Sequence, residues 1–178
     1  MVFPNTGIPP QQREGFQAVI NNGKIYIFVG SESDAFGKMI IFNLNLQDSI
    51  WSLEVNNNPP LARYGYTATI LVVKIYELRQ FWHFGYTIPM YNTLKDNWSN
   101  AKMNPTGKII PEGRQMHSAV LSKFNTIIVY GGYYYKVSSK PELVILDISN
   151  PIYNWIQPIT GKTLKSRWVI LQLILIYK

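Results

Sequence analysis

The chain has 178 residues, of which 47% are hydrophobic and 14% aromatic, and its formal net charge is +7. A chain of this length buries about 70% of the surface that its unfolded form exposes, which is enough for a hydrophobic core. It contains no cysteine, so disulfides and thiolate metal sites are excluded. The 17 basic residues are scattered rather than clustered. We therefore expect a solvated basic surface and no nucleic-acid partner, although a positive balance also suits an anionic membrane.

The first unit of the chain, about 9–55, follows an apolar lead-in (1–8) that we expect to pair as an additional strand. The unit holds four short apolar segments that predict strands rather than helices, because none shows a 3.6-residue stripe. These segments are GFQAVI (15–20), KIYIFV (24–29), KMIIFNL (38–44) and IWSLEV (50–55). Asn22-Gly23, between the first two segments, predicts a two-residue hairpin turn.

The second unit, about 59–99, is less regular than the first. Its apolar run TATILVVKIYEL (67–78) has no turn signal where the first unit has Asn22-Gly23. The nearest glycine to the expected end of its second strand is Gly85, five residues late. Two explanations are open: an insertion with a compensating deletion, or an error in the gene model through an altered reading frame or incorrect splicing.

The third unit, about 111–157, is the most regular, and we expect its four strands near 117–122, 126–131, 142–148 and 153–157. A partial unit at 164–178 ends in the apolar run from Trp168 to Ile176, which Gln172 interrupts. A bilayer needs about 20 apolar residues in a row. We therefore expect no membrane span in this chain, and we interpret the terminal run as a buried or edge strand.

Fixed points recur along the chain with a period near 50. Four arginines follow one another at separations of 50, 51 and 53 residues, and each of the first three units ends on a tryptophan. The arginines are Arg13, Arg63, Arg114 and Arg167, and the tryptophans are Trp51, Trp98 and Trp155. A repeating unit of this size cannot bury both its faces alone, so successive units must stack on one another. Because the arginines recur, we expect them to be structural, pairing with an acidic side chain or a carbonyl of a neighbouring unit.

Several of these segments together resemble the kelch motif, in which each repeat forms one blade of a β-propeller. They are RQMHSAV, IIVYGG, LVILD and Trp155 in the third unit and, more weakly, REGFQAV, IYIFVG, IIFN and Trp51 in the first. The resemblance implies four-stranded blades around a central channel. We expect an all-β chain over 1–178, a single incomplete propeller domain with about three four-stranded antiparallel blades and the start of a fourth. Such a chain would be a fragment or truncated member of a longer propeller, and its open edges would favour self-association.

The same resemblance implies a non-catalytic module for protein interaction, as kelch propellers commonly are. The alternative is a remnant of a galactose-oxidase-like kelch enzyme, a family that uses copper, histidine ligands and a tyrosine crosslinked to cysteine. The chain has no cysteine and only two histidines, His83 and His117. We therefore expect no enzymatic activity, metal or cofactor, and a structural role for His117. The N-terminus lacks a secretory signal, which favours the cytoplasm.

The strongest candidate for a binding site is Tyr133, Tyr134, Tyr135 and Lys136, which we expect to begin the long loop after the second strand of the third unit. Exposed tyrosines offer large contact area at low entropic cost and suit a protein partner. They also suit base stacking on single-stranded nucleic acid. A third interpretation is that alternate tyrosines only cap the blade core.

The segment SESDAFG (31–37) holds the corresponding position in the first unit. Both segments should emerge on one side of the molecule, because loops at the same point of successive repeats lie on the same side. Lys136 and Lys140 would favour an acidic protein as the partner.

Overall fold

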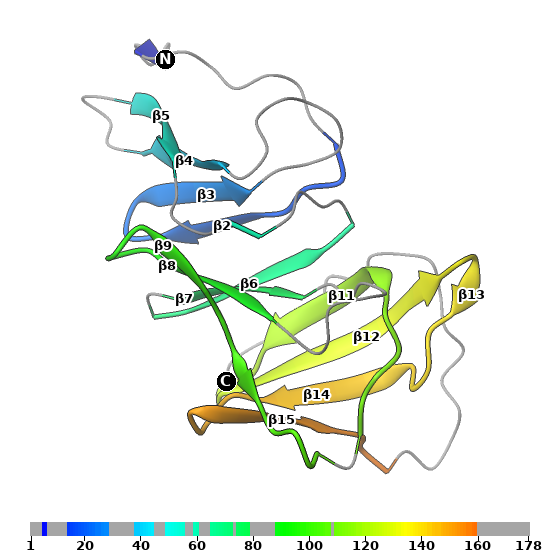
Figure 1. Ribbon diagram of the computed structural model, residues 1–178. Coiled ribbons are helices and arrows are strands. Elements are labelled where there is room, and N and C mark those ends of the chain that lie inside the picture. The colour runs from blue at the N-terminus through cyan, green and yellow to red at the C-terminus, as the bar shows by residue number, and fades with distance from the viewer. Residues whose placement is uncertain are drawn as a thin grey trace.

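The computed structural model describes residues 5–6, 14–28, 38–44, 49–55, 59–60, 65–72, 74–78, 88–107 and 109–159. These residues form strands, turns and irregular segments that assemble into three separate sheets (Figure 1). The expected all-β class is confirmed. Among the described residues there is no helix that is both long and apolar enough to cross a membrane.

The first sheet has its strands in sequence order, each antiparallel to the next. Its strands are β2 (Ala18–Asn21), β3 (Lys24–Phe28), β4 (Lys38–Asn43) and β5 (Ser49–Val55). The short strand β1 (Asn5–Thr6) adds in parallel to β5, as expected for the lead-in. Asn22 and Gly23 have φ angles of 47° and 70° and form the expected hairpin turn.

The second sheet is also a complete four-stranded antiparallel sheet, although its sequence departs most from the repeat. Its strands are β6 (Thr67–Leu71), β7 (Lys74–Leu78), β8 (Pro89–Asn92) and β9 (Asn97–Asn100). Leu71 pairs with Lys74, so a two-residue turn divides the apolar run, and Val72 takes a φ of 55° there. The turn lies 50 residues after the one at Asn22, with valine at a position that favours asparagine or glycine. Gly85 lies outside the described residues.

The third sheet contains the longest of the described strands, β12. Its main strands are β11 (Gln115–Leu121), β12 (Thr126–Tyr134), β14 (Leu143–Asp147) and β15 (Ile152–Ile156). The short strand β13 (Val137–Ser138) pairs with the end of β12. The prediction that the second strand ends at residue 131 is wrong, since β12 continues through two glycines to Tyr134.

The linker after the second sheet also joins the third. Its strand β10 (Lys102–Met103) runs parallel to β15, in the same way that β1 runs parallel to β5. The amide of Asn104 donates to the carbonyl of Tyr153 at 2.9 Å, and its side-chain amide donates to Asn154 Oδ1 at 2.8 Å. The linker is therefore hydrogen-bonded to the outermost strand of the third sheet.

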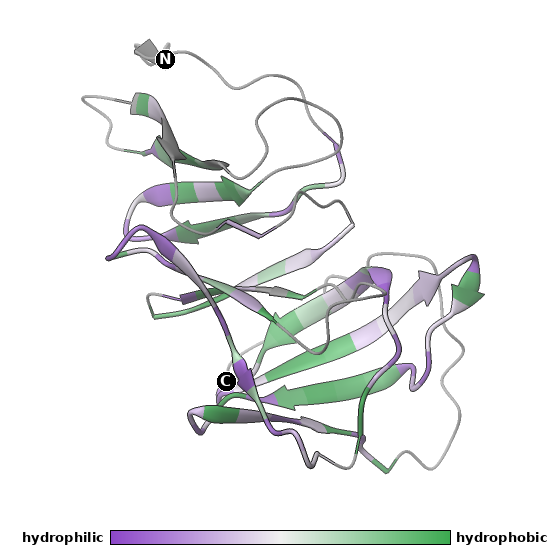
Figure 2. Ribbon diagram, viewed as in Figure 1, coloured by the Kyte–Doolittle hydropathy of each residue, from purple (hydrophilic) through white to green (hydrophobic). Residues whose placement is uncertain are grey.

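The sheets stack face to face as three blades, with β6 lying between β2 and β11 (Figure 1). One apolar core fills the space between the first and second blades, and a second core fills the space between the second and third. Figure 2 shows the hydrophobic strands that line these spaces. The first core holds Tyr26, Phe28, Met39, Ile41, Ile75, Tyr91 and Trp98. The second holds Tyr76, Leu78, Ile88, Ala101, Ile127, Val129, Val144, Leu146, Ile148 and Tyr153.

The three repeated tryptophans occupy equivalent positions in the last strand of each blade. Each pairs with the residue before the Asn or Asp of the third strand: Trp51 with Phe42, Trp98 with Tyr91, and Trp155 with Leu146. The prediction of equivalent places is confirmed, but the prediction that Trp51 and Trp155 are buried is wrong, since both are half-buried. Trp98 is buried because its ring packs at 4.5 Å, between centroids, on Phe28 of the first blade.

Candidate functional site

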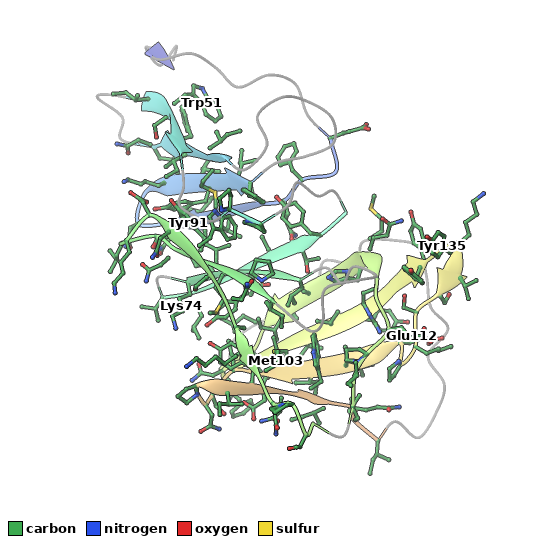
Figure 3. The ribbon with its side chains drawn as sticks, in the orientation of Figure 1. Trp51, Lys74, Tyr91, Met103, Glu112 and Tyr135 are labelled. Atoms are coloured by element: carbon green, nitrogen blue, oxygen red, sulfur yellow. The ribbon has the colours of Figure 1, made fainter. Side chains whose placement is uncertain are left out.

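The tyrosine run lies on a strand and a tight turn rather than at the start of a long loop. Tyr133 pairs with Gln115 of β11 and with Ser138 of β13, and Tyr134 pairs with Val137. Tyr135 and Lys136 form the two-residue turn, with φ angles of 46° and 66°. We call β12, this turn and β13 the β12–β13 hairpin, whose tip Figure 3 shows at Tyr135. The expected loop is therefore replaced by a hairpin.

Exposure differs among the four predicted site residues. Tyr135 is 71% exposed and Lys136 is exposed, whereas Tyr133 and Tyr134 are half-buried. The ring of Tyr135 stands edge-on to that of Tyr134, with centroids 4.7 Å apart. Partial burial, and then the proximity of Tyr135, raises the pKa of Tyr134. The structure adds Val137 to the exposed residues of the site, since its side chain is 68% exposed. Strand alternation predicts this exposure once the turn is placed at Tyr135 and Lys136.

The two glycines before the tyrosines let β12 pass close to β11. Gly131 and Gly132 have φ angles of 72° and 84°. A Cβ atom at Gly132 would lie 2.9 Å from the Cβ of His117 and 3.0 Å from the carbonyl oxygen of Gln115. Only glycine fits this approach. The pair therefore continues the strand toward the tyrosines instead of ending it.

Arg114 holds the base of the hairpin from inside the third blade. Its guanidinium donates to the carbonyl oxygens of Pro141 at 2.8 Å and Gly131 at 3.1 Å, and its Nε donates to that of Glu112 at 3.3 Å. Desolvation, opposed by Glu112, lowers the pKa of Arg114 to about 10, so the group stays charged at neutral pH. The recurring arginine is structural as expected, but the carbonyls belong to its own blade and not to a neighbour. The other three arginines lie outside the described residues.

A second set of contacts fixes the chain that returns from the hairpin. Ser139 Oγ donates to the carbonyl of Gly113 at 2.7 Å, and the amide of Lys140 donates to Glu112 Oε2 at 2.7 Å. Lys140 Nζ forms an ion pair with Glu142 at 2.6 Å. Lys140 thus has an acidic neighbour in its own blade while its side chain stays 60% exposed, and its contact with a partner protein stays a prediction.

His117 connects two blades. It is buried, and its Nε2 shares a hydrogen bond of 2.7 Å with Thr67 Oγ1 of the second blade. Tyr66, at the same position of the preceding repeat, donates its hydroxyl to the carbonyl of Phe28 in the first blade. The structural role expected for His117 agrees with this contact. Among the described residues, no three His, Cys, Asp or Glu side chains gather as metal ligands, and His83 lies outside them.

The inner strands are also linked by a backbone ladder at one repeat position. The amide of Gly65 donates to the carbonyl of Gly15 at 2.8 Å, and the amide of Met116 donates to the carbonyl of Gly65 at 2.9 Å. All three residues have positive φ, between 55° and 66°. Sequence reasoning missed this ladder because methionine replaces glycine in the third repeat. Together with His117, the ladder connects the third blade to the second. It therefore also fixes the position of the hairpin, which belongs to the third blade.

Comparisons with known proteins agree with this architecture. Residues 123–153 match the family model of the LVIVD repeat, a segment that includes β14, whose sequence is LVILD. A solved structure titled "Structure of YjhT" is similar over 85% of this chain and 53% of its own, with a TM-score of 0.65 and 13% identity. The chain thus spans about half the length of that protein. No curated protein sequence matches it. The stacked four-stranded sheets and this likeness show that the chain has the fold of a β-propeller whose described blades do not close into a ring.

Proposed function

We propose that the chain is a non-catalytic, kelch-type module that binds a protein partner through the β12–β13 hairpin. The observation that carries the proposal is the placement of two large apolar side chains, Tyr135 and Val137, in solvent beside Lys136. Large aromatic side chains at a rigid position supply much of the binding energy in protein interfaces. Lys136 favours a partner with an acidic patch beside an apolar pocket.

Rigidity of the hairpin supports this function. Tyr133 and Tyr134 are hydrogen-bonded into the sheet, and Arg114 binds the carbonyls on both sides of the hairpin base. A preorganised hairpin loses little conformational entropy on binding, so its exposed side chains contribute more of their contact energy to affinity. Binding residues on a firm sheet scaffold are a common arrangement.

Two observations support the non-catalytic part of the proposal. The sequence has no cysteine, which rules out the tyrosine–cysteine crosslink of the galactose oxidase family. The described histidine, His117, uses its Nε2 to bind Thr67. Stoichiometric copper retained by the purified full chain would contradict this part of the proposal.

The binding surface is tested by capture on the immobilised full chain. Replacement of Tyr135 and Val137 by serine should weaken capture of the partner about tenfold or more, the effect typical of truncated interface anchors. The matched control carries Leu94→Ser and Phe124→Ser, two side chains of similar exposure on other turns. If the hairpin variant captures the partner as well as the wild type does, the hairpin is not the contact surface. The same conclusion follows if the control variant no longer captures the partner. Circular dichroism confirms that both variants keep the fold.

A further inference from the structure

The end of the molecule opposite the hairpin collects the tight turns of all three blades. The turns between β2 and β3, β6 and β7, β8 and β9, β11 and β12, and β14 and β15 all lie on one side, away from the β12–β13 hairpin (Figure 1). We call this side the turn end. In Figure 3 it carries Lys74, whereas Tyr135 lies on the opposite side. The proposed function does not use this surface.

Apolar side chains stand in solvent at the tips of these turns. Val72 is 75% exposed, Leu94 is 73% exposed and Phe124 is 72% exposed, one on each of three turns. Ile20, beside the first turn, and Ile152, after the last, are also exposed. Single exposed apolar residues need no explanation. Their repetition on three turns of two successive blades does need one.

Hydrogen bonds hold these tips in place. Asn92 Oδ1 accepts from the amides of Leu94 at 3.0 Å and Lys95 at 3.1 Å, which fixes the second-blade tip. In the third blade, Ser122 Oγ accepts from the amide of Phe124 at 3.1 Å. The carbonyl of Val72 accepts from the side-chain amide of Asn21 at 3.0 Å. Each turn therefore holds its apolar residue away from the core, at a position that polar residues ordinarily occupy.

Lysines surround the apolar tips. Five of the described lysines lie exposed at or beside these turns: Lys24, Lys74, Lys95, Lys102 and Lys123. The described acidic residues at the turn end are Asp96, which accepts from the hydroxyl of Tyr91 at 2.8 Å, and Asp147, which accepts from the amide of Ser149 at 2.9 Å. The described lysines thus outnumber the described carboxylates there, and both carboxylates are already hydrogen-bonded. The hairpin end, by contrast, pairs Lys140 with Glu142.

We propose that the turn end is a docking surface for an anionic phospholipid membrane, with Val72, Leu94 and Phe124 entering the interface and the lysines contacting the headgroups. Protruding apolar tips with a surrounding set of lysines have the chemistry of an interfacial binding surface. The apolar tips stand on separate turns, and a fluid interface accommodates separate protrusions, whereas a protein surface would need a matching pocket for each. An anionic leaflet complements the positive charge. The chain would then lie on the membrane, with the β12–β13 hairpin directed away from it.

Flotation of the full chain with lipid vesicles tests the proposal, and it separates bound protein from self-associated protein. The chain should float with mixed phosphatidylcholine–phosphatidylserine vesicles. With vesicles of phosphatidylcholine alone it should remain at the bottom of the gradient. Each lysine near an anionic surface contributes about fivefold in affinity, so Lys74→Gln with Lys95→Gln should weaken binding by about 25-fold. Leu94→Ser with Phe124→Ser should weaken it about tenfold or more, because apolar side chains no longer enter the interface.

Matched controls come from the hairpin. Tyr135→Ser with Val137→Ser removes side chains of similar exposure, and Lys136→Gln removes a similarly exposed charge. Both should leave flotation unchanged, whereas the first weakens the protein contact proposed above, so the two proposals fail separately. Three results would overturn the membrane proposal. They are the absence of flotation with phosphatidylserine vesicles, flotation that is insensitive to the Leu94 and Phe124 changes, and binding to soluble polyglutamate without binding to vesicles, which would identify an acidic protein as the partner.

Discussion

The hydroxyl groups of Tyr76 and Tyr153 lie 3.2 Å apart in the core between the second and third blades. Their rings are tilted at 53°, with centroids 6.1 Å apart, and both side chains are buried. Tyr76 comes from β7 and Tyr153 from β15, so the contact joins the second strand of one blade to the last strand of the next. The two blades are thus linked through a polar contact inside the apolar core between them.

This contact predicts a loss of stability at alkaline pH. Burial, followed by the hydrogen bond to Tyr153, raises the pKa of Tyr76 above the ordinary value of 10.0. A folded-state pKa above the unfolded value contributes stability that is present below pH 10 and is lost as the pH rises toward the folded pKa. Urea unfolding should show this decline in the wild type and a smaller one in Tyr76→Phe. At neutral pH the variant should lose about 1 kcal/mol, the value of one hydrogen bond. Equal alkaline declines in both proteins would contradict the assignment.

Replacement of Arg114 by methionine should destabilise the third blade by about 3 kcal/mol, because carbonyl acceptors at the hairpin base lose a charged donor. Arg114→Lys keeps the charge but not the planar fork, so its loss should be intermediate. The control is Lys136→Met at the exposed turn, expected to change the free energy of unfolding by no more than about 0.5 kcal/mol. Equal stabilities of the Arg114 and Lys136 methionine variants would show that the guanidinium does not hold the hairpin. Urea denaturation measures all three.

Two glycines with similar backbone angles offer a matched test of close packing. Gly132→Ala places a Cβ atom against β11 at a φ of 84°, whereas a Cβ at Gly23, with a φ of 70°, meets nothing within 4 Å. Gly23→Ala should therefore lower the free energy of unfolding by only about 1–2 kcal/mol, the cost of holding alanine at a positive φ. Gly132→Ala should lose at least about 2 kcal/mol more, because β11 and β12 must separate. Thermal or urea unfolding measures the stability of both variants. Equal losses of stability would refute this account.

The open arrangement of the blades predicts self-association. Phe42 and Trp51, with ring centroids 4.4 Å apart, lie on the face of the first blade that points away from the second. Trp51 stays half-buried there, and covering such a face yields about 25 cal/mol per Å² of apolar area. Sedimentation velocity should show a mass that rises with protein concentration. A single monomeric species at every concentration would contradict the prediction.

The sequence alone determined the strands and their order for local reasons. Alternating apolar residues, Asn22-Gly23 and the recurring tryptophans gave the blades and their internal register, because strand period and turn chemistry act over a few residues. The same reasoning failed at Val72, which takes a positive φ in a tight turn although valine does not favour one. It also failed at Tyr133-Tyr134, because Gly131 and Gly132 continue the strand that a glycine pair is expected to end.

The tertiary structure decided what the repeated positions do. Arg114 binds the carbonyl of Pro141, which the fold brings from 27 residues farther along the chain. Met116 replaces glycine in a ladder that joins three blades. The tyrosine run divides into half-buried strand residues and an exposed tip because the return strand β13 pairs with β12. Whether a side chain is buried or offered to a partner depends on what lies across a sheet. That neighbour comes from another part of the chain, beyond the reach of local pattern.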